Sequence, residues 1–564
     1  MADKSKVRGA KQKKKVTSKA SASVKGGGAG PIVCGYRSDL GVILGDVPAK
    51  PQKPWGRVVV CSANMPPDKV VGHLLEGAPE WVVRGALGRG EEIIFCPTVS
   101  GPFWIVKARG LVPAASNKAE GKGDGKTGRV AAQSHAAAAQ QRPGLVSHGG
   151  LVAVSSYAKA REMAGRWLAD PVASGLEGVS IDFSHVSREE VLGFGVGLEM
   201  GLYRYQKARA GNGSLNVHLA DAHTETFKQA KSIGLSVNTS RHLVNMPPGQ
   251  LTPSVMVEAA SSLFGDHASA VTCEVWDNKR LLSEGMGLLS GVGQGAEDQP
   301  CLLVMKYRPG KSKNPKRVAI VGKGVTFDTG GLDLKGADNM RLMKKDMGGA
   351  ASVLGFARWL DLNRPDFPCD LYLALAENAI GPKAIRPGDV LKARNGATVE
   401  IHNTDAEGRL VMADAMDVAL TPEDPDNIVA LIDVATLTGA IKVALGTRFA
   451  GLFSNYDPLA ELCLSAGQTW GDPCWRMPVV DEYGDQLRSS VADFMNCSSS
   501  RFGGAITAAV FLQRFVRGKP WAHLDIYGWT DRADGPCREE GGSGQGVQCL
   551  IGLVERWSRH MSKL

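Results

Sequence analysis

The chain of 564 residues is too long for one ordinary hydrophobic core, and its composition (43% hydrophobic, 22% charged) excludes a collagen-like, coiled-coil or wholly disordered protein. It has no run of 18 or more apolar residues, so we expect no membrane span, and its eleven scattered cysteines indicate reduced thiols in the cytoplasm. The net charge of +9 fits a nucleic-acid-binding protein, but most of it lies in two short segments.

The first of these segments, residues 1–30, is predicted to be a disordered basic tail. It holds nine Lys or Arg residues against Asp3 alone, a charge of +8, among Ser, Ala and Gly without apolar periodicity. Such a segment cannot bury enough apolar surface to offset its ordering entropy. No apolar stretch follows it, so we expect no secretory signal.

Residues 31–233 are predicted to form a smaller N-terminal α/β domain. The run RVVVC at 57–61 is typical of a buried strand, and residues 156–233 have a helix-like pattern. Residues 110–150 are rich in Gly, Ala, Gln and Lys, which indicates a flexible insertion in a surface loop. The stretch 107–142 carries a further +5, which leaves the rest of the chain mildly acidic at −4.

Residues 235–564 are predicted to form a larger catalytic α/β domain with a mostly parallel central sheet. Apolar runs without polar alternation, typical of strands buried on both faces, alternate here with helical stretches. The runs are 317–321, 370–375 and 428–432, and the helical stretches are 348–361 and 408–420. Ligands of such sheets bind beyond the carboxyl ends of the strands, so we expect the catalytic residues there.

Three segments of this domain carry charged residues among glycines just after strand-like runs. They are KGVTFDTGG at 323–331, with Lys335 beyond it, KKDMGGA at 344–350 and NTDAEGRL at 403–410. Glycines let the backbone turn tightly and approach a ligand closely. The acidic residues of the three segments are Asp328, Asp346, Asp405 and Glu407.

Four carboxylates gathered at strand ends repel one another and cannot all stay ionised in a semi-buried site without cations. Such a set suits two divalent metal ions, and both zinc and manganese fit carboxylates with one amine. The alternative for each acid taken alone is a helix cap or a surface charge, and Asp405 in particular could cap the helix that begins near Gly408.

The basic residues of the same segments have distinct expected roles. Near two dications, the pKa of Lys323 would fall until its neutral amine could bind metal, whereas Lys335 could stay protonated and donate to an oxyanion. Arg409 offers a planar fork that suits a small anion such as bicarbonate.

The octapeptide NTDAEGRL at 403–410 resembles the signature of the leucyl aminopeptidase family, which are cytosolic, hexameric, di-metal aminopeptidases. The segments KGVTFDTGG and DMGGA are similar to the two other metal segments of that family, and DVATLTG at 433–439 to its substrate-pocket loop. Residues 505–511 and 521–526 (WAHLDI) match as well. The resemblance is strong over 235–564, faint over 31–233 and absent over the tail and the insertion.

The resemblance implies a role for each matching position. Asp328 and Glu407 would bridge both metals, Lys323 and Asp346 would complete one of them, and Asp405 would complete the other. Lys335 would stabilise the negatively charged intermediate, and Arg409 would hold a bicarbonate that acts as general base for the bridging water. The substrate would lie against Met343, Asn403, Thr436, Leu437 and Gly439.

We therefore predict a cytoplasmic, homohexameric aminopeptidase that releases leucine or other apolar residues from the N-termini of peptides. A second hypothesis is DNA binding by an oligomer, because the tail and the insertion would multiply into a large positive field. The lysines of these segments have no interleaved aromatic residues, which favours only weak, salt-sensitive association with nucleic acid. A third hypothesis is a catalytically silent scaffold, which the intact set of ligands argues against.

Overall fold

The computed structural model describes several strands near the N-terminus and most of the chain beyond residue 153. The described residues are 32–33, 36–37, 42–44, 55–61, 93–98, 101–107, 154–169, 176–184, 186–205, 214–219, 223–265, 268–310 and 315–561. The expected tail (1–30) and insertion (110–150) therefore lie outside the described residues. Within the described ranges, no helix combines the length and the apolar character needed to cross a membrane.

The N-terminal half contains a six-stranded sheet in the order β3-β8-β7-β4-β6-β5. Neighbouring strands are parallel except for the antiparallel pair β5 and β6. The strands are β3 (Val42–Leu44), β4 (Trp55–Cys61), β5 (Ile93–Thr98), β6 (Gly101–Lys107), β7 (Gly178–Asp182) and β8 (Leu215–Leu219). Strand β4 confirms the strand predicted at 57–61. A separate pair, β1 (Ile32–Val33) and β2 (Tyr36–Arg37), is antiparallel.

Three helices pack against this sheet: α3 (Ser156–Trp167), α5 (Arg188–Leu202) and α7 (Thr224–Asn245). Trp167, Phe194 and Phe227, one from each helix, share a buried core with Trp104 of β6. The prediction of a helix-like pattern over the whole of 156–233 was wrong, because β7 and β8 interrupt it. Each of these strands has only five residues, too few for the alternation of buried and half-buried side chains to stand out.

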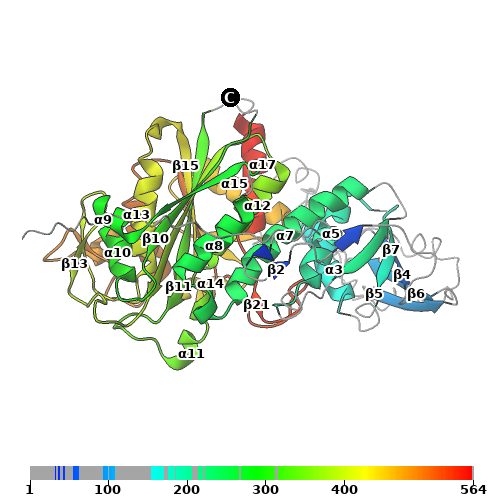
Figure 1. The fold of residues 1–564 in the computed structure, drawn as a ribbon, viewed down its shortest axis with the longest axis horizontal. Coiled ribbons are helices and arrows are strands. Elements are labelled where there is room, and N and C mark those ends of the chain that lie inside the picture. The colour runs from blue at the N-terminus through cyan, green and yellow to red at the C-terminus, as the bar shows by residue number, and fades with distance from the viewer. Residues whose placement is uncertain are drawn as a thin grey trace, which may run out of the picture.

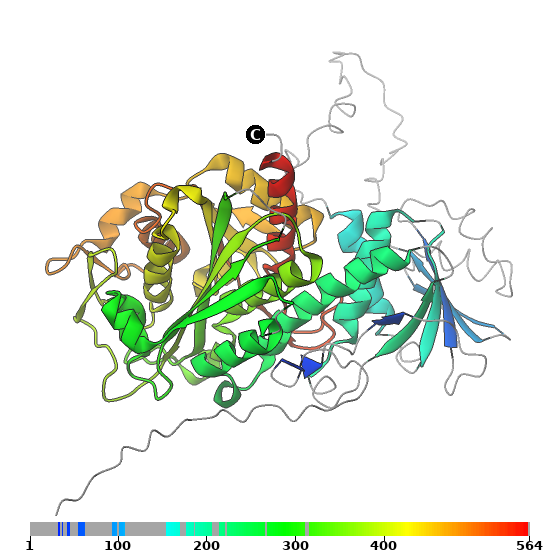
Figure 2. The same ribbon diagram turned by 45° about the horizontal axis from the view of Figure 1, so that its top comes forward.

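Helix α7 connects the two halves of the molecule. It runs unbroken through residues 233–235, where the sequence places the domain boundary, and its residues Ile233 and Val237 pack in the core of the second half. Figures 1 and 2 show α3, α5 and α7 between the two sheets. The division of the chain into an N-terminal and a catalytic domain remains a prediction, with one sheet on each side of this helix layer.

The second half contains an eight-stranded sheet in the order β17-β16-β19-β15-β11-β12-β10-β9. Its four central strands, β19-β15-β11-β12, are parallel to one another, which confirms an α/β fold with a mostly parallel sheet. The strands are β9 (Val271–Trp276), β10 (Cys301–Tyr307), β11 (Arg317–Asp328), β12 (Cys369–Asn378), β15 (Ile428–Ala435), β16 (Ala450–Ser454), β17 (Cys474–Arg476) and β19 (Trp521–Asp525). They include all three strands predicted for this half.

Helices cover both faces of this sheet (Figure 1). Along β11, Val318 and Ile320 pack in one core with α7, α8, α12, α15 and α17, whereas Ala319 and Val321 pack in a second core with α10, α13 and α16. These helices are α8 (Pro253–Phe264), α10 (Gly287–Gly293), α12 (Gly348–Asn363), α13 (Gly408–Leu420), α15 (Asp457–Thr469), α16 (Gly504–Gln513) and α17 (Val547–Met561). Because successive strand residues point to opposite faces, the apolar runs of the sequence fill two cores at once.

Smaller elements complete the fold. A three-stranded sheet has the order β13-β14-β18, and β20 pairs with β21. The remaining elements are β13 (Val390–Lys392), β14 (Thr398–Glu400), β18 (Phe494–Met495), β20 (Trp529–Thr530), β21 (Gly541–Gly542), α9 (Asn278–Ser283), α11 (Ala337–Met340), α14 (Gly439–Leu445), η1 (Pro248–Gln250), η2 (Met343–Lys345), η3 (Pro425–Asn427) and η4 (Asp481–Leu487). The loop between β14 and α13 carries the first five residues of the segment NTDAEGRL, and its last three begin α13.

Candidate metal centre

The four parallel central strands all end at the same edge of the large sheet, and polar side chains gather there. Asp328, Asn378 and Asp525 are the last residues of β11, β12 and β19, and Thr436 follows the last residue of β15. Loops from two other places reach the same edge, one with Asp346 between η2 and α12 and one with Asp405 and Glu407 before α13. The carboxyl ends of parallel strands are the usual position of a binding site in this class of fold.

Three of the four predicted carboxylates meet directly. One oxygen each of Asp328, Asp405 and Glu407 lies within 4.8 Å of the other two, a spacing at which all three can hold one metal ion. The structure thus brings together residues that are nearly 80 positions apart in the sequence. Asp328 and Glu407 are buried, whereas Asp405 lies at the exposed side of the group.

Lys323 joins the fourth carboxylate to this group. Its Nζ lies 2.7 Å from Oδ2 of Asp346 and 3.0 Å from Oε1 of Glu407, and it donates to the carbonyl oxygen of Thr436 at 3.0 Å. The lysine side chain is only 2% exposed. Asp346 and Glu407 therefore share one buried ammonium group in the middle of the site.

Lys335 lies on the other side of the group. Its Nζ is 2.8 Å from Oδ2 of Asp328 and also contacts Oδ1 of Asp405. Each of the two lysines thus contacts two of the four acidic residues. Of the seven predicted metal and catalytic residues, all except Arg409 take part in one of these two groups of ion pairs, and Arg409 follows Glu407 by two positions.

The pKa values show that the site carries an excess of negative charge. Burial and the Asp328 carboxylate together raise the pKa of Glu407 to about 8, and Lys323 only partly opposes them. Burial and Asp328 also raise the pKa of Asp405. Burial alone would lower the pKa of Lys323 and of Lys335, but the surrounding carboxylates outweigh it and raise both. Carboxylates whose pKa values are raised despite two neighbouring lysines lack enough positive charge around them, and their oxygens are suitable ligands for divalent cations.

Glycines make the close approach of these groups feasible. Gly330 and Gly331 have φ angles of +86° and +67°, in the left-handed region, and the amide of Gly330 donates to Oδ1 of Asp328 at 2.8 Å. At Gly408 an added Cβ would lie 2.6 Å from Nζ of Lys323, so a side chain there would displace the central ammonium. These positions explain the glycines that flank the acidic residues in the sequence.

The helix-cap alternative for Asp405 was wrong. The N-cap residue of α13 is Glu407, and its side chain makes no capping hydrogen bond. Both carboxylates are turned to the ion pairs described above instead. Arg409, the second residue of α13, is buried, and burial lowers its pKa. Its Nη1 donates to the carbonyl oxygen of Asn496 at 2.9 Å, and its Nε has no partner among the described residues.

The residues predicted to line the substrate site differ in how closely they adjoin the carboxylates. Thr436 donates its hydroxyl to Oδ1 of Asp346 at 2.8 Å, and the side chain of Asn403 accepts the amide of Asp405 at 2.7 Å. Leu437 lies against Gly408: a Cβ added to Gly408 would be 3.0 Å from Cδ1 of Leu437. Met343 is half-buried in η2, and Gly439 is exposed at the start of α14.

Three residues that sequence reasoning did not select hold the site in place. Nδ2 of Asn378 donates to Oδ1 of Asp328 at 2.8 Å and to the carbonyl oxygen of Thr404 at 3.1 Å, and so connects the segment that carries Asp328 with the one that carries Asp405. Asp525 accepts the amides of Leu437 and Thr438 at 3.0 and 3.2 Å. Asn496 contacts the NTDAEGRL loop. The segment WAHLDI, which contains Asp525, was the only signal that pointed to any of the three.

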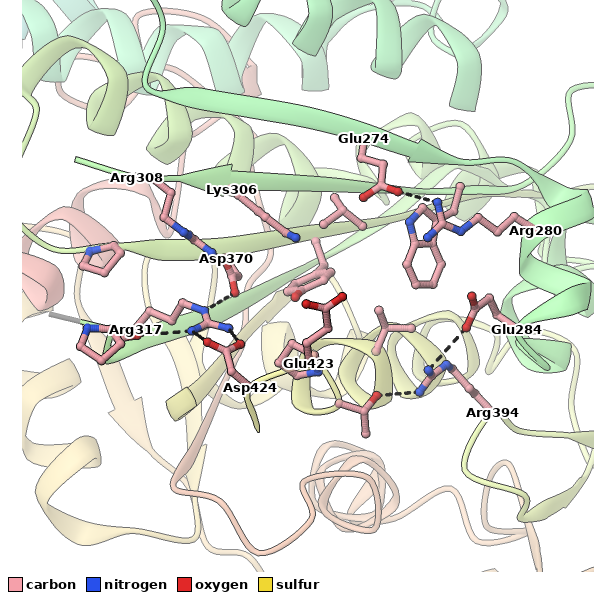
Figure 3. Close-up of a pocket in the computed structure, with 18 of the residues that line it drawn as sticks. Glu274, Arg280, Glu284, Lys306, Arg308, Arg317, Asp370, Arg394, Glu423 and Asp424 are labelled. Carbon is pink, nitrogen blue, oxygen red and sulfur yellow. Dashed lines mark hydrogen bonds and ion pairs between the residues drawn. The ribbon is translucent and has the colours of Figure 1, made fainter. Parts of the chain in front are cut away.

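A cavity of about 650 Å³ lies at the opposite edge of the large sheet (Figure 3). Arg317, the first residue of β11, contacts Asp370 at 2.5 Å and also pairs with Asp424, and Arg308 contacts Asp370 at 2.5 Å. Arg280 pairs with Glu274 in the same wall. These guanidinium groups are already neutralised by carboxylates. The cavity is separate from the candidate metal centre because it adjoins the amino ends of the same strands.

Comparisons with known sequences match the half of the chain that carries this site. Residues 238–551 match the model of the cytosol aminopeptidase family, catalytic domain. A probable cytosol aminopeptidase of Solibacter usitatus is 40% identical over 369 residues, which cover 64% of this chain and 75% of that protein. One of a Bradyrhizobium strain is 42% identical over 369 residues, which cover 64% of this chain and 72% of that protein.

Two solved structures resemble the fold over about nine-tenths of the chain. The crystal structure of the cytosol aminopeptidase from Coxiella burnetii has a TM-score of 0.71 and 28% identity, and covers 91% of this chain and 99% of that one. The bottromycin maturation enzyme BotP in complex with Mn has a TM-score of 0.71 and 30% identity, and covers 89% of this chain and 99% of that one. These comparisons do not support the DNA-binding hypothesis.

Proposed function

This chain belongs to the cytosol aminopeptidase family and is a metal-dependent aminopeptidase, and we propose that three of its segments hold two divalent metal ions at the edge of the large sheet. The ligands would be Lys323, Asp328, Asp346, Asp405 and Glu407. The observation that carries this proposal is the cluster of Asp328, Asp405 and Glu407, whose oxygens lie within 4.8 Å of one another in a region where carboxylate pKa values are raised. Asp346 belongs to the same set because it shares the ammonium group of Lys323 with Glu407.

In peptide hydrolysis the metals and Lys335 would have different roles. Two divalent ions, when bound, lower the pKa of a shared water, polarise the scissile carbonyl and accept the free α-amine, which restricts cleavage to chain ends. Lys335 is held beside Asp328 and stays protonated, because the surrounding carboxylates raise its pKa. It would donate a hydrogen bond to the carbonyl oxygen of the substrate as that oxygen becomes negatively charged.

Arg409 would hold a bicarbonate ion that serves as general base. Its guanidinium group is buried, and one of its nitrogens, Nε, has no partner among the described residues. A planar, permanently charged fork of this kind suits a small planar anion. Buried groups with unused hydrogen-bonding capacity are costly, so a bound anion would also satisfy Arg409.

The substrate's first residue would lie against Met343, Asn403, Thr436, Leu437 and Gly439. Met343 and Leu437 are half-buried apolar side chains. They favour leucine or another apolar residue at the peptide N-terminus. Thr436 and Asn403 are hydrogen-bonded to the segments that carry Asp346 and Asp405, so they would border the substrate backbone.

The metal would be zinc or manganese, both of which suit carboxylate ligands with one amine. The solved complex of the similar BotP with Mn supports manganese as one of the two. We also propose that the protein acts in the cytosol, where the name of its family places the relatives, and that it forms a homohexamer. Light scattering on the purified protein would test the hexamer, because the mass should equal six chains.

Metal analysis of the purified protein, alongside cleavage of leucyl and other aminoacyl amides, tests the proposed function. We expect two metal ions per chain, faster cleavage of leucyl amide than of glycyl amide, and no cleavage of N-acetyl-leucyl amide. Chelation should abolish activity, and zinc or manganese should restore it. Full peptidase activity in the chelated protein, with no metal in it, would contradict the proposal.

A further inference from the structure

Asn496 is a fully buried residue beside the loop that carries two of the proposed metal ligands. It follows β18, whose Phe494 and Met495 pair in parallel with Val399 and Glu400 of β14. Its amide donates to the carbonyl oxygen of Glu400 at 2.9 Å, which continues this pairing by one residue. Because the loop of residues 402–407 continues from β14, Asn496 lies alongside it although Asn496 and Asn403 are 93 positions apart in the sequence.

The side chain of Asn496 uses its whole hydrogen-bonding capacity on this loop. Oδ1 accepts the amides of His402 and Asn403 at 2.8 and 3.2 Å, and Nδ2 donates to the carbonyl oxygens of Asn403 and Ala406 at 2.6 and 3.4 Å. A carboxamide offers two acceptor positions and two donors, and all four are used. The reversed orientation of the amide would place donors against donors, so only one orientation fits.

The backbone of the same residue holds Arg409. Its carbonyl oxygen accepts Nη1 of Arg409 at 2.9 Å, the only hydrogen bond found for that guanidinium group among the described residues. Asn496 thus contacts the loop before Glu407 and the side chain two residues after it. The other side of the loop is held through Thr404, which receives a hydrogen bond from Asn378 and exchanges hydrogen bonds with Asp333.

We propose that Asn496 is a positioning residue for the peptidase reaction: it holds Asp405, Glu407 and Arg409 in place relative to Asp328. This inference rests on the proposed function of those residues. Without the carboxamide, two amides and two carbonyl oxygens of residues 402–406, in a partly buried region, lose their partners, and the loop must shift to find others. A shift of the loop moves two metal ligands and the anion-binding arginine together.

A merely structural role would be to join β14 to β18, and Asp493 provides a matched control for it. Asp493 lies three residues before Asn496 and links the same two strands, because its carboxylate accepts the amide and the hydroxyl of Thr398, both at 2.7 Å. Among the described residues, it makes no hydrogen bond or ion pair with residues 402–409. Asp493→Ala therefore weakens the connection between β14 and β18 and leaves the hydrogen bonds between Asn496 and residues 402–406 intact.

The test compares Asn496→Leu, Asn496→Asp and Asp493→Ala with the wild-type holoenzyme. Metal dissociation constants come from competition with a chelating dye, kcat and KM from leucyl amide, and Tm from unfolding at saturating metal. Groups that orient metal ligands typically contribute about 10–100-fold to metal affinity or activity. We expect Asn496→Leu to lose kcat and metal affinity by about that factor with little change in KM, and Asp493→Ala to lower only Tm.

Asn496→Asp keeps the proposal testable if Asn496→Leu does not fold. Its second oxygen would face the carbonyl oxygens of Asn403 and Ala406, and only the protonated acid could donate to them. Its activity relative to wild type should therefore be higher at pH 5.5 than at pH 8. The inference is overturned if folded Asn496 variants keep wild-type kcat and metal affinity, or if Asp493→Ala loses both equally. If the wild type itself needs no metal, it is the proposed function that fails.

Discussion

Nζ of Lys335 lies 2.8 Å from Oδ2 of Asp328, so the lysine assigned to the substrate carbonyl contacts a carboxylate assigned to the metals. The same ammonium group contacts Asp405. Lys335 therefore does not have to be brought to the site by substrate, because two carboxylates already hold it there. The contact also means that the charge of Lys335 opposes metal binding, and its removal should not weaken the metal site.

We expect Lys335→Met to separate catalysis from metal binding. Loss of one donor to a developing oxyanion typically lowers kcat by about 10²–10³-fold. The metal content should stay at the wild-type level, because the substitution leaves all the proposed ligands in place. It also removes a positive charge that competes with the metal. Steady-state kinetics with metal analysis of the same sample measures both. A variant that loses its metal together with its activity would show that Lys335 is a structural part of the metal site.

Asp328→Asn and Glu407→Gln should lose metal as well as activity. Both residues are buried. Asp328 contacts Lys335 and Glu407 contacts Lys323, and each lysine also contacts a second carboxylate of the cluster. Each change therefore removes one of the proposed ligands at the centre of the site. Metal analysis after dialysis is the measurement. Asp424→Asn is the matched control, because Asp424 pairs with Arg317 at the opposite edge of the sheet. Normal metal content in the first two variants would contradict the ligand assignment.

Metal binding should release protons, and metal affinity should therefore decrease as the pH is lowered. In the chelated protein Glu407 has its pKa raised to about 8 by burial and by Asp328, so it is mostly protonated at pH 7. Metal binds the ionised carboxylate, so binding expels this proton below about pH 8 and its cost grows as the pH falls. Lys323, whose pKa the carboxylates raise, would release a second proton on coordination.

Calorimetry at pH 7 in two buffers of different ionisation enthalpy counts the released protons. We expect about one to two per chain and a smaller number at pH 9, where Glu407 is already ionised. A binding heat that does not depend on the buffer would contradict the raised pKa of Glu407.

Asp525→Ala should weaken substrate binding without removing metal. Asp525 accepts two amides and a hydroxyl of residues 437–438, and this loop carries side chains assigned to the substrate pocket. Loss of buried hydrogen bonds costs about 1–3 kcal/mol each, so we expect kcat/KM to fall at least about tenfold, mainly through KM. Thr436 remains held by Lys323 and Asp346, so metal should be retained.

Asp414→Ala is the control for this experiment. Asp414 is also buried and accepts the amides of Leu288, Leu289 and Arg394, away from the metal centre. Asp414→Ala should lower Tm as Asp525→Ala does, but its KM should equal that of the wild type. Equal effects of the two variants on KM would show that Asp525 acts only through general stability.

Arg409→Ala should remove the response of the enzyme to bicarbonate. If Arg409 holds a bicarbonate general base, wild-type turnover should rise when bicarbonate is added to a carbonate-free assay, and the variant should be slow at every concentration. Metal content should stay near normal, because the proposed ligands are unchanged. A variant that responds to bicarbonate as the wild type does would place the anion elsewhere.

Much of the fold could be predicted because its patterns are local. The apolar runs at 317–321, 370–375 and 428–432 became β11, β12 and β15, and the predicted helices became α12 and α13. Strands buried on both faces lack polar alternation, which also indicated a parallel sheet. The strands β7 and β8 were missed, because five residues between long helices give too little pattern to separate them from their surroundings.

The candidate catalytic residues could be chosen from the amino-acid sequence, because the acidic and basic residues of three segments stand among glycines at strand ends. The meeting of Asp328, Asp405 and Glu407 follows from the folding of the whole chain, and so do the hydrogen bonds that Asn378, Asn496 and Asp525 make to Asp328, to residues 402–406 and to residues 437–438. The reason is physical. Local spacing sets which way a side chain points along its own element, whereas a hydrogen bond between β18 and the loop after β14 depends on how distant strands are paired.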